Sequence, residues 1–431
     1  MTGGEPPAAT RIDTRLVART RRLDDEREVD LIDVAGETGT LWARGSVGFA
    51  GRGEVARVGV PAGDPAAAAR AVQDALDAIE VDDEVGHPGC GPVALGALPF
   101  DPDTPGEVVV PRVLVGQAED GTRWLTTIHP VGHAEADRPA LAVLDELLAP
   151  PDQRPGPDPR SFTVTSTRPA EDWCRSVVAA REELRTGVAR KVVLARELLI
   201  EVEQPLCRQD VLRQLRRSYP TCMVFADGGF VGASPELLVA RTGDRVRSHP
   251  MAGTAPRSAD PVVDARLAAD LSASAKDQIE HRYTIDMVHE TLLPWCSYLD
   301  EEAEPSIVAM ANVQHLATLV EGQLSSPPAS VVELMRALHP TPAVNGSPRR
   351  EALALISRHE GIDRGRYAGP VGWVDRHGNG AWAVGIRSAE IDGCRARVFA
   401  GVGVVADSDP EAELAETRAK FQALLGAIVR P

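Results

Sequence analysis

The helix expected at the end of the chain, PEAELAETRAKFQALLGAIV, places two acids and a lysine close together. At about 100° per residue, Glu413, Glu416 and Lys420 fall within about a 60° arc that borders an apolar stripe. Such a pattern is typical of a solvated helix edge with one Glu–Lys pair. Two glutamates spaced i,i+3 can also supply hard oxygen ligands to Mg²⁺.

A second acidic group lies in SAKDQIEHRY, where Asp277 and Glu280 fall on a long helix expected over Val263–Leu293. By itself this group is an ordinary solvated charged face. If an acid from this helix met the two from the last helix, a three-carboxylate site would form. The spacing alone does not say whether they meet.

Three polar residues stand in apolar surroundings and each allows two interpretations. Lys191 opens the apolar strand 191–200, either as a snorkelling end residue or as a desolvated amine able to act as a base. Glu236, after a strand and a proline, is either a turn carboxylate or a partly buried general acid. Arg387, in the middle of the strand AVGIRSAEI, is either an edge-strand arginine or a bidentate carboxylate clamp. Together, a base, an acid, a metal cluster and an anion clamp indicate proton-transfer chemistry on a small anionic substrate.

The composition limits the possible function classes. The 431 residues are 43% hydrophobic and 25% charged, as in a globular protein, and a net charge of -17 argues against a nucleic-acid groove. The six cysteines show no zinc-like spacing. Because no signal peptide and no apolar run of about 18 residues is visible, we expect a cytoplasmic protein without a membrane partner.

The elements that must position these residues change in character along the chain. Residues 1–12 are expected to be disordered, and 13–150 form a mixed region with a strand-like stretch at Glu107–Val115 and a helix at Pro65–Ile79. A Pro-rich connection covers 149–160. Irregular alternation of helices and hairpins predicts an α+β fold.

The pattern after the Pro-rich connection is denser. We expect a helix at 170–187, the strand 191–200 and two short strands at 222–227 and 230–234. Three antiparallel strands follow at 367–375, 381–391 and 395–405, joined by the turns RHGNG and IDGC. Asp409 can cap the final helix, with Pro410 at its first position.

A series of motifs occurs in order over 165–431: GASPELL, HPMAGTAPR, SAKDQIEH, NVQHLATLVEG, HPTPAVNGSP, YAGPVGW, IRSAEI, FAGVGVV and DPEAELAE. The series resembles the chorismate-utilising enzymes of menaquinone, siderophore and tryptophan synthesis, and is most similar to the isochorismate synthases. Before it, only GALPFDP at 96–102 is suggestive. The resemblance implies a single large unit of two packed antiparallel β-sheets surrounded by helices. In it, 165–431 is the chorismate-binding catalytic region and 13–150 completes the fold.

The resemblance also implies proton-transfer and metal roles. Lys191 matches the lysine that activates water for attack at C2 of chorismate, and Glu236 matches the acid that protonates the departing C4 hydroxyl. Glu280 and Glu416 match Mg²⁺ ligands, and Glu413 matches a nearby acid that acts directly or through metal-bound water. Asp277 is expected just behind these ligands.

The remaining matched positions surround the substrate. Arg387, Tyr367 and the backbone at Gly401 match contacts to the enolpyruvyl carboxylate, with Lys420 close to the same end. Thr254 lines the pocket. His315 matches a pocket histidine whose catalytic role the resemblance leaves open.

The choice among the family's reactions depends on few positions. Ammonia-using relatives take nitrogen from a glutaminase, which this chain lacks; Lys191 favours water as nucleophile, so no glutaminase subunit is expected. Salicylate synthases typically carry Thr where this chain has Ala343, which favours stopping at isochorismate. Salicylate synthesis, an aminodeoxy-type reaction and a catalytically silent chorismate-binding subunit remain alternatives. A monomer or a homodimer is expected, and the sequence does not choose between menaquinone and siderophore synthesis.

Overall fold

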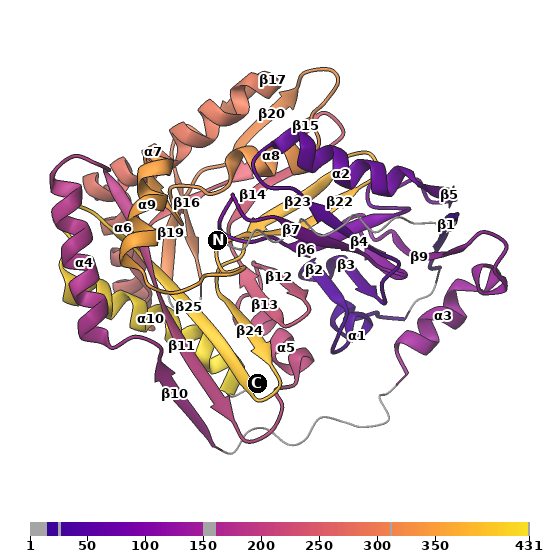
Figure 1. The fold of residues 1–431 in the computed structure, drawn as a ribbon, viewed down its shortest axis with the longest axis horizontal. Helices are drawn as coiled ribbons and strands as arrows, with labels where there is room; N and C mark the ends of the chain where they lie inside the picture. The colour runs from indigo at the N-terminus through magenta and orange to yellow at the C-terminus, as the bar shows by residue number, and fades with distance from the viewer. Residues whose placement is uncertain (1–14, 25–26, 150–160, 311–312, 430–431) are drawn as a thin grey trace, which may run out of the picture.

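Two large β-sheets are stacked face to face in this computed structural model, which describes residues 15–24, 27–149, 161–310 and 313–429 (Figure 1). Side chains from both sheets meet between them: Phe49 and Trp124 of one sheet pack with Trp373 of the other. This arrangement confirms the predicted α+β unit of two packed sheets. Pairing is antiparallel except between β1 and β5, which run parallel.

The larger sheet has thirteen strands. Its order is β10 (Phe162–Ser166), β11 (Lys191–Val202), β25 (Arg395–Val404), β24 (Ser388–Asp392), β13 (Phe230–Ser234), β12 (Met223–Asp227), β2 (Thr40–Arg44), β3 (Val47–Arg52), β8 (Val113–Gln117), β9 (Arg123–Pro130), β1 (Leu16–Arg22) and β5 (Ile79–Asp83), with β21 (Gly346–Ser347) beside β11. Strands from before and after residues 150–160 are therefore neighbours in one sheet, where β2 pairs with β12.

The second sheet has nine strands. Its order is β17 (Cys296–Glu301), β20 (Val320–Leu324), β15 (Arg245–His249), β14 (Leu237–Thr242), β23 (Gly380–Val384), β22 (Pro370–Asp375), β6 (Val93–Ala97), β7 (Gly106–Val110) and β4 (Ala56–Val60). A small third sheet contains β16 (Met251–Pro256), β19 (Val313–Ala317) and β18 (Ser306–Ala309).

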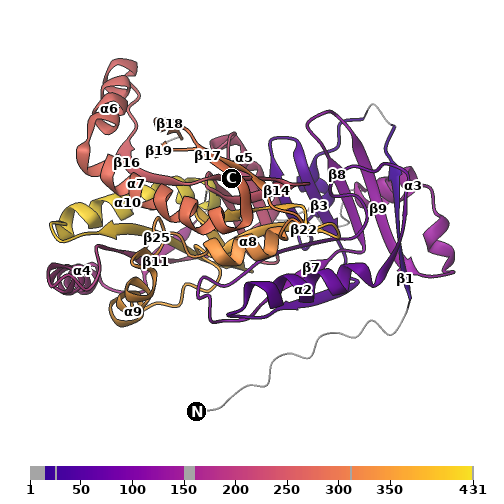
Figure 2. The same ribbon diagram turned by 90° about the horizontal axis from the view of Figure 1, so that it is seen from above.

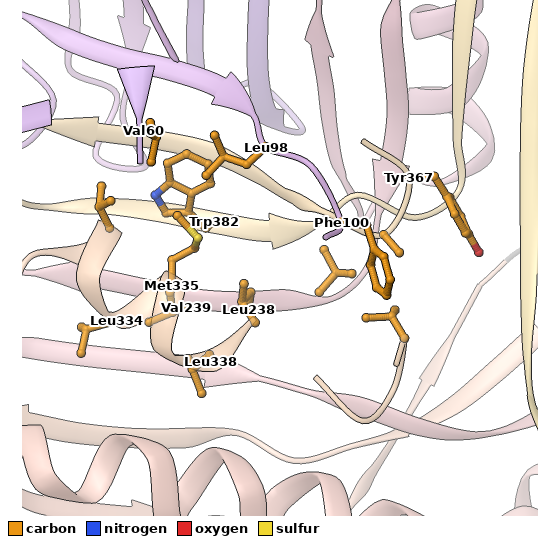
Figure 3. Packing of buried hydrophobic residues seen from close by; sticks show 14 of the residues in the cluster. Val60, Leu98, Phe100, Leu238, Val239, Leu334, Met335, Leu338, Tyr367 and Trp382 are labelled. Atoms are coloured by element: carbon orange, nitrogen blue, oxygen red, sulfur yellow. The ribbon is translucent and has the colours of Figure 1, made fainter. Parts of the chain in front are cut away.

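Ten α-helices lie among the described residues. They are α1 (Leu31–Ala35), α2 (Pro65–Asp77), α3 (Ala140–Leu147), α4 (Ala170–Arg185), α5 (Arg208–Ser218), α6 (Pro261–Ala273), α7 (Ala275–Leu292), α8 (Val331–Leu338), α9 (Arg349–His359) and α10 (Pro410–Val429). Helices α2 and α8 pack on the nine-stranded sheet, where Met335 and Leu338 join a core with Val239 and Trp382 (Figure 3). None of the described helices combines the length and apolar character needed to cross a membrane.

The last helix forms as the sequence predicts. Asp409 accepts a hydrogen bond from the backbone N–H of Ala412, and Pro410 is the first helical residue. The apolar stripe is buried against the thirteen-stranded sheet through Phe421, Leu424 and Ile428. Both hairpins predicted near the C-terminus are confirmed, as β22–β23 and β24–β25.

Three predicted elements are wrong, because in the structure each of them is divided into two elements. The helix expected over Val263–Leu293 is two helices, α6 and α7, since Ser274 has an extended backbone and its hydroxyl caps α7. Figure 2 shows α6 standing away from the sheets. The stretch Glu107–Val115 is split at Pro111, which has no N–H, into β7 and β8 of different sheets. The strand AVGIRSAEI is likewise split into β23 and β24.

Two further predictions fall outside the described residues: the disorder of residues 1–12 and all but the first residue of the Pro-rich connection at 149–160.

Candidate active site

One cavity of about 320 Å³ gathers every residue that the sequence singled out for chemistry. Its lining includes Lys191, Glu236, Thr254, Asp277, Glu280, His315, Ala343, Tyr367, Arg387, Gly401, Glu413, Glu416 and Lys420. These residues come from the thirteen-stranded sheet, the small sheet, α7, α10 and the segments that connect strands. The structure thus brings together what the sequence leaves far apart, although the roles of the individual residues stay predictions.

Glu236 and Arg387 lie where the chain passes from one large sheet to the other. Residues 235–236 connect β13 to β14, and 385–387 connect β23 to β24. The two crossings are hydrogen bonded, from Ala233 N–H to the Arg387 carbonyl (3.1 Å) and from Val384 N–H to the Glu236 carbonyl (3.1 Å). Arg387 is therefore not mid-strand as predicted; its φ of 52° turns the chain at the break.

The Glu236 carboxyl is enclosed. The residue is only 3% exposed, and its Oε1 has no hydrogen-bond partner among the described residues. Burial raises the pKa of Glu236 to about 8, although the Lys191 charge opposes this shift. A carboxyl group that keeps its proton at neutral pH can act as a general acid.

Lys191 is positioned at the start of β11 and is 9% exposed. Its Nζ donates a 2.7 Å hydrogen bond to Oε1 of Glu280 on α7. The neighbouring strand β25 leaves room for this side chain, because a Cβ at Gly403 would lie 2.6 Å from Lys191 Cε. Burial by itself would raise the pKa of Glu280, but Lys191 and more distant lysines bring it below its usual value.

The carboxylates proposed as metal ligands face the same cavity but are not clustered. Glu413 accepts a 2.8 Å hydrogen bond from Ser408 Oγ, and Glu416 pairs with Lys420 at 2.6 Å. Burial raises the pKa of Glu413. In the described part of the chain, no group of three or more His, Cys, Asp or Glu side chains is close enough to hold a metal ion.

The oxygen donors nevertheless fit Mg²⁺, which prefers carboxylates. Glu280 and Glu416 each pair with a lysine through Oε1, and each carboxylate has a second oxygen that can bind a metal ion. Asp277 is held by its hydrogen bond with Ser274 at the start of α7.

Cationic and phenolic groups line the part of the cavity near β25. Lys420 Nζ donates to the Gly401 carbonyl at 2.9 Å, and burial lowers the pKa of Lys420. Tyr367 stacks on Phe399 with ring centroids 5.0 Å apart. The buried Nε of Arg387 has no partner among the described residues. These groups can bind a carboxylate.

His315 on β19 is neutral in this site. Burial, and then the charges of Arg387 and Lys420, lower the pKa of His315 to about 3. Its Nδ1 lies 3.1 Å from the Gly253 carbonyl, so we assign the proton to Nδ1, which also lies 3.0 Å from Thr254 Oγ1. A neutral imidazole here can accept a hydrogen bond through Nε2 but does not add charge.

Among the lining residues to which the sequence analysis gave no role in the site are Lys276, interpreted with its neighbours as part of a solvated charged face, and Gly403. Lys276 precedes Glu280 by one helical turn, a spacing that could have placed both on one face of α7. Gly403 lies two residues after Gly401, so the alternation of a strand puts both on one face of β25.

Comparison with known proteins identifies relatives of this chain. The family described as "Chorismate binding enzyme" matches residues 27–429. The isochorismate synthase DhbC of Bacillus subtilis is 37% identical over 348 residues, 78% of this chain and 81% of that protein. The isochorismate synthase MenF of Bacillus subtilis is 35% identical over 366 residues, 80% of this chain and 77% of that protein.

A solved structure shares the fold. The menaquinone-specific isochorismate synthase MenF from Escherichia coli superposes with a TM-score of 0.81, covering 96% of this chain and 95% of that chain at 24% identity. With the family match over most of the chain, the conclusion follows that this protein belongs to the chorismate-binding enzyme family.

Proposed function

We propose that this enzyme is an isomerase that converts chorismate into isochorismate. The observation that carries the proposal is that one cavity holds a lysine, Lys191, and a carboxyl group kept neutral by burial, Glu236, beside cations suited to an anionic substrate. The relatives that carry the name isochorismate synthase support the same reaction.

In the proposed reaction, a hydroxyl group is added at C2 of the ring and the hydroxyl group at C4 is lost. Lys191 removes a proton from a water molecule while the oxygen of that water forms a bond to C2 of chorismate, and the ring double bond shifts. Glu236 gives its proton to the C4 hydroxyl, which leaves as water. One water is added and one is lost, so the product is an isomer of the substrate. Lys191 must leave its contact with Glu280 to reach the water.

The substrate is a dianion, and the cavity offers groups for its enolpyruvyl carboxylate. Arg387, Tyr367, Lys420 and the backbone of Gly401 are proposed to hold that carboxylate. Their enclosure among buried strands strengthens each charged contact and fixes the ring between Lys191 and Glu236.

Magnesium is proposed as the cofactor, held by Glu280 and Glu416 with Glu413 nearby. When bound, it would offset the charge of the ring carboxylate. We expect Glu280→Gln and Glu416→Gln each to weaken Mg²⁺ activation at least about tenfold, because each removes a charged oxygen donor.

Mg²⁺ titrations of activity, paired with calorimetric Mg²⁺ binding, measure this effect. Glu411→Gln is the matched control, since Glu411 is exposed on the first turn of α10 and does not line the cavity. Unchanged Mg²⁺ dependence in both variants would remove Glu280 and Glu416 from the metal site.

A product assay tests the reaction itself. Enzyme, chorismate and Mg²⁺ are incubated, and the products are separated by chromatography. Isochorismate without salicylate supports the proposal, as expected with Ala343 in the pocket wall. Salicylate with pyruvate would indicate a salicylate synthase, and binding without turnover would indicate a silent subunit.

A further inference from the structure

Lysine is rare in this chain and is confined to one place. Of its 46 Lys and Arg residues only three are lysines, Lys191, Lys276 and Lys420; the rest are arginines. All three lysines line the candidate active-site cavity. Two of them already have a proposed role, as base and as substrate contact. Lys276 has none.

Lys276 lies on the first turn of α7, at the mouth of the cavity. The residue is exposed, and within the described residues its ammonium group makes no hydrogen bond or ion pair. It also lines a second, adjoining hollow of about 290 Å³, which shares Lys191, Lys276 and Glu280 with the main cavity. Lys276 is therefore a free positive charge where the two spaces join.

The adjoining hollow has both buried and exposed side chains in its lining. Its rim is formed by exposed side chains, among them Ile279, Tyr283 and Arg190, whose guanidinium lies 5.2 Å from the Tyr283 ring centroid. Its inner end is the buried Lys191 with its partner Glu280. A ligand bound in this hollow would therefore lie beside both Lys276 and Lys191.

A free positive charge at this point offsets the repulsion between an acidic cavity wall and an anionic substrate. The chain has a net charge of -17, and the wall of the cavity includes the acidic residues Asp277, Glu280, Glu413 and Glu416. A dianionic substrate is repelled by such a surface unless a local positive charge receives it. Charges on an approach path change association rates by on the order of tenfold or more.

The type of side chain matters as well. A planar guanidinium binds carboxylates bidentately, and Glu280 and Glu413 are close enough for Lys276 to lower the pKa of both. An arginine here could bind these acids bidentately, whereas the Lys276 ammonium group makes no ion pair among the described residues.

We propose that Lys276 is a substrate-binding residue that receives a carboxylate of the dianionic substrate at the mouth of the active site. This inference rests on the proposed function, because it takes chorismate as the substrate.

Steady-state kinetics of the full-length enzyme test the proposal, with chorismate as substrate and a salt series. We expect Lys276→Gln to raise KM about tenfold, to leave kcat within about twofold, and to flatten the salt dependence of kcat/KM. Lys276→Arg is expected to raise KM as well. Arg282→Gln is the control, because it removes a positive charge from the same helix but lines neither cavity. Calorimetric titration of each variant with chorismate, without Mg²⁺, gives binding independently of turnover.

Each possible outcome either supports or overturns the proposed role of Lys276. Unchanged KM and chorismate affinity in Lys276→Gln would overturn the proposal while leaving the proposed function intact. An equal KM rise in Arg282→Gln would also overturn it, since the effect would then reflect overall charge. Loss of kcat alone would assign Lys276 to the reaction and not to substrate capture. If the wild-type enzyme neither binds nor converts chorismate, both proposals fail.

Discussion

Glu236 is a carboxyl group whose surroundings favour its neutral form, and this has a consequence for stability. Its pKa is about 8 in the folded protein against an ordinary 4.5. Between these values the unfolded chain has released the proton and the folded chain retains it. The free energy of unfolding therefore falls as pH rises from about 4.5 to about 8, and this contribution levels off above that range.

We predict that Glu236→Gln has a more favourable effect on the free energy of unfolding at pH 8 than at pH 5. Glutamine is never ionised, so the variant loses the pH-dependent cost of keeping a carboxylate buried. Thermal unfolding of both proteins at pH 5 and pH 8 measures the difference. A Tm difference that is the same at both pH values would contradict the buried neutral carboxyl.

Lys191 is the second residue with a proposed proton-transfer role. We predict that Lys191→Ala lowers kcat by about 10²- to 10⁴-fold, the usual range for loss of a general base. Chorismate should still bind, because Arg387, Tyr367 and Lys420 remain. Steady-state kinetics and calorimetry check both statements; near-normal turnover would exclude Lys191 as the base.

At the scale of secondary-structure elements, β25 determines where the Lys191 side chain can lie. A Cβ at Gly403 would come 2.6 Å from Lys191 Cε and 3.2 Å from its Nζ. The lysine end is flexible, so the strand should tolerate the change while the amine moves. We predict that Gly403→Ala lowers kcat at least about tenfold with little change in Tm, because small displacements of a reacting group are costly.

The matched control for this variant is Gly59→Ala on β4, where an added Cβ meets nothing within 4 Å. Normal kinetics of Gly403→Ala would show that Lys191 does not need this space. A large loss of Tm would show that the strand, and not the lysine, responds.

At the scale of the whole molecule, the site depends on sheets that span the chain. Strand β12 pairs with β2, and β22 pairs with β6, so the region after residue 160 supplies only part of each sheet. We predict that a fragment of residues 161–431 does not fold, because removing β2 and β6 exposes two strand edges and the apolar space between the sheets. Far-UV circular dichroism and size-exclusion chromatography test this; a monodisperse, cooperatively unfolding fragment would contradict it.

Features that depend on local chemistry were predictable from the residues alone. The cap at Asp409, the hairpin turns and the amphipathic stripe of α10 follow from neighbouring residues, and the structure confirms them. The ordered motifs were sufficient to identify the family. The sequence also contains only three lysines, two of which, Lys191 and Lys420, the resemblance had already assigned to the site.

The positions where elements break, and the residues that meet in the site, depend on tertiary packing. Periodicity looks the same in a continuous strand as in one that changes sheets, so the break at 385–387 depends on distant pairing partners. The neutral state of Glu236 depends on burial between sheets, which its local sequence does not encode. The acids of α7 and α10 looked like solvated helix edges for the same reason: a charged face becomes the wall of a site only when packing brings a second charged face opposite it.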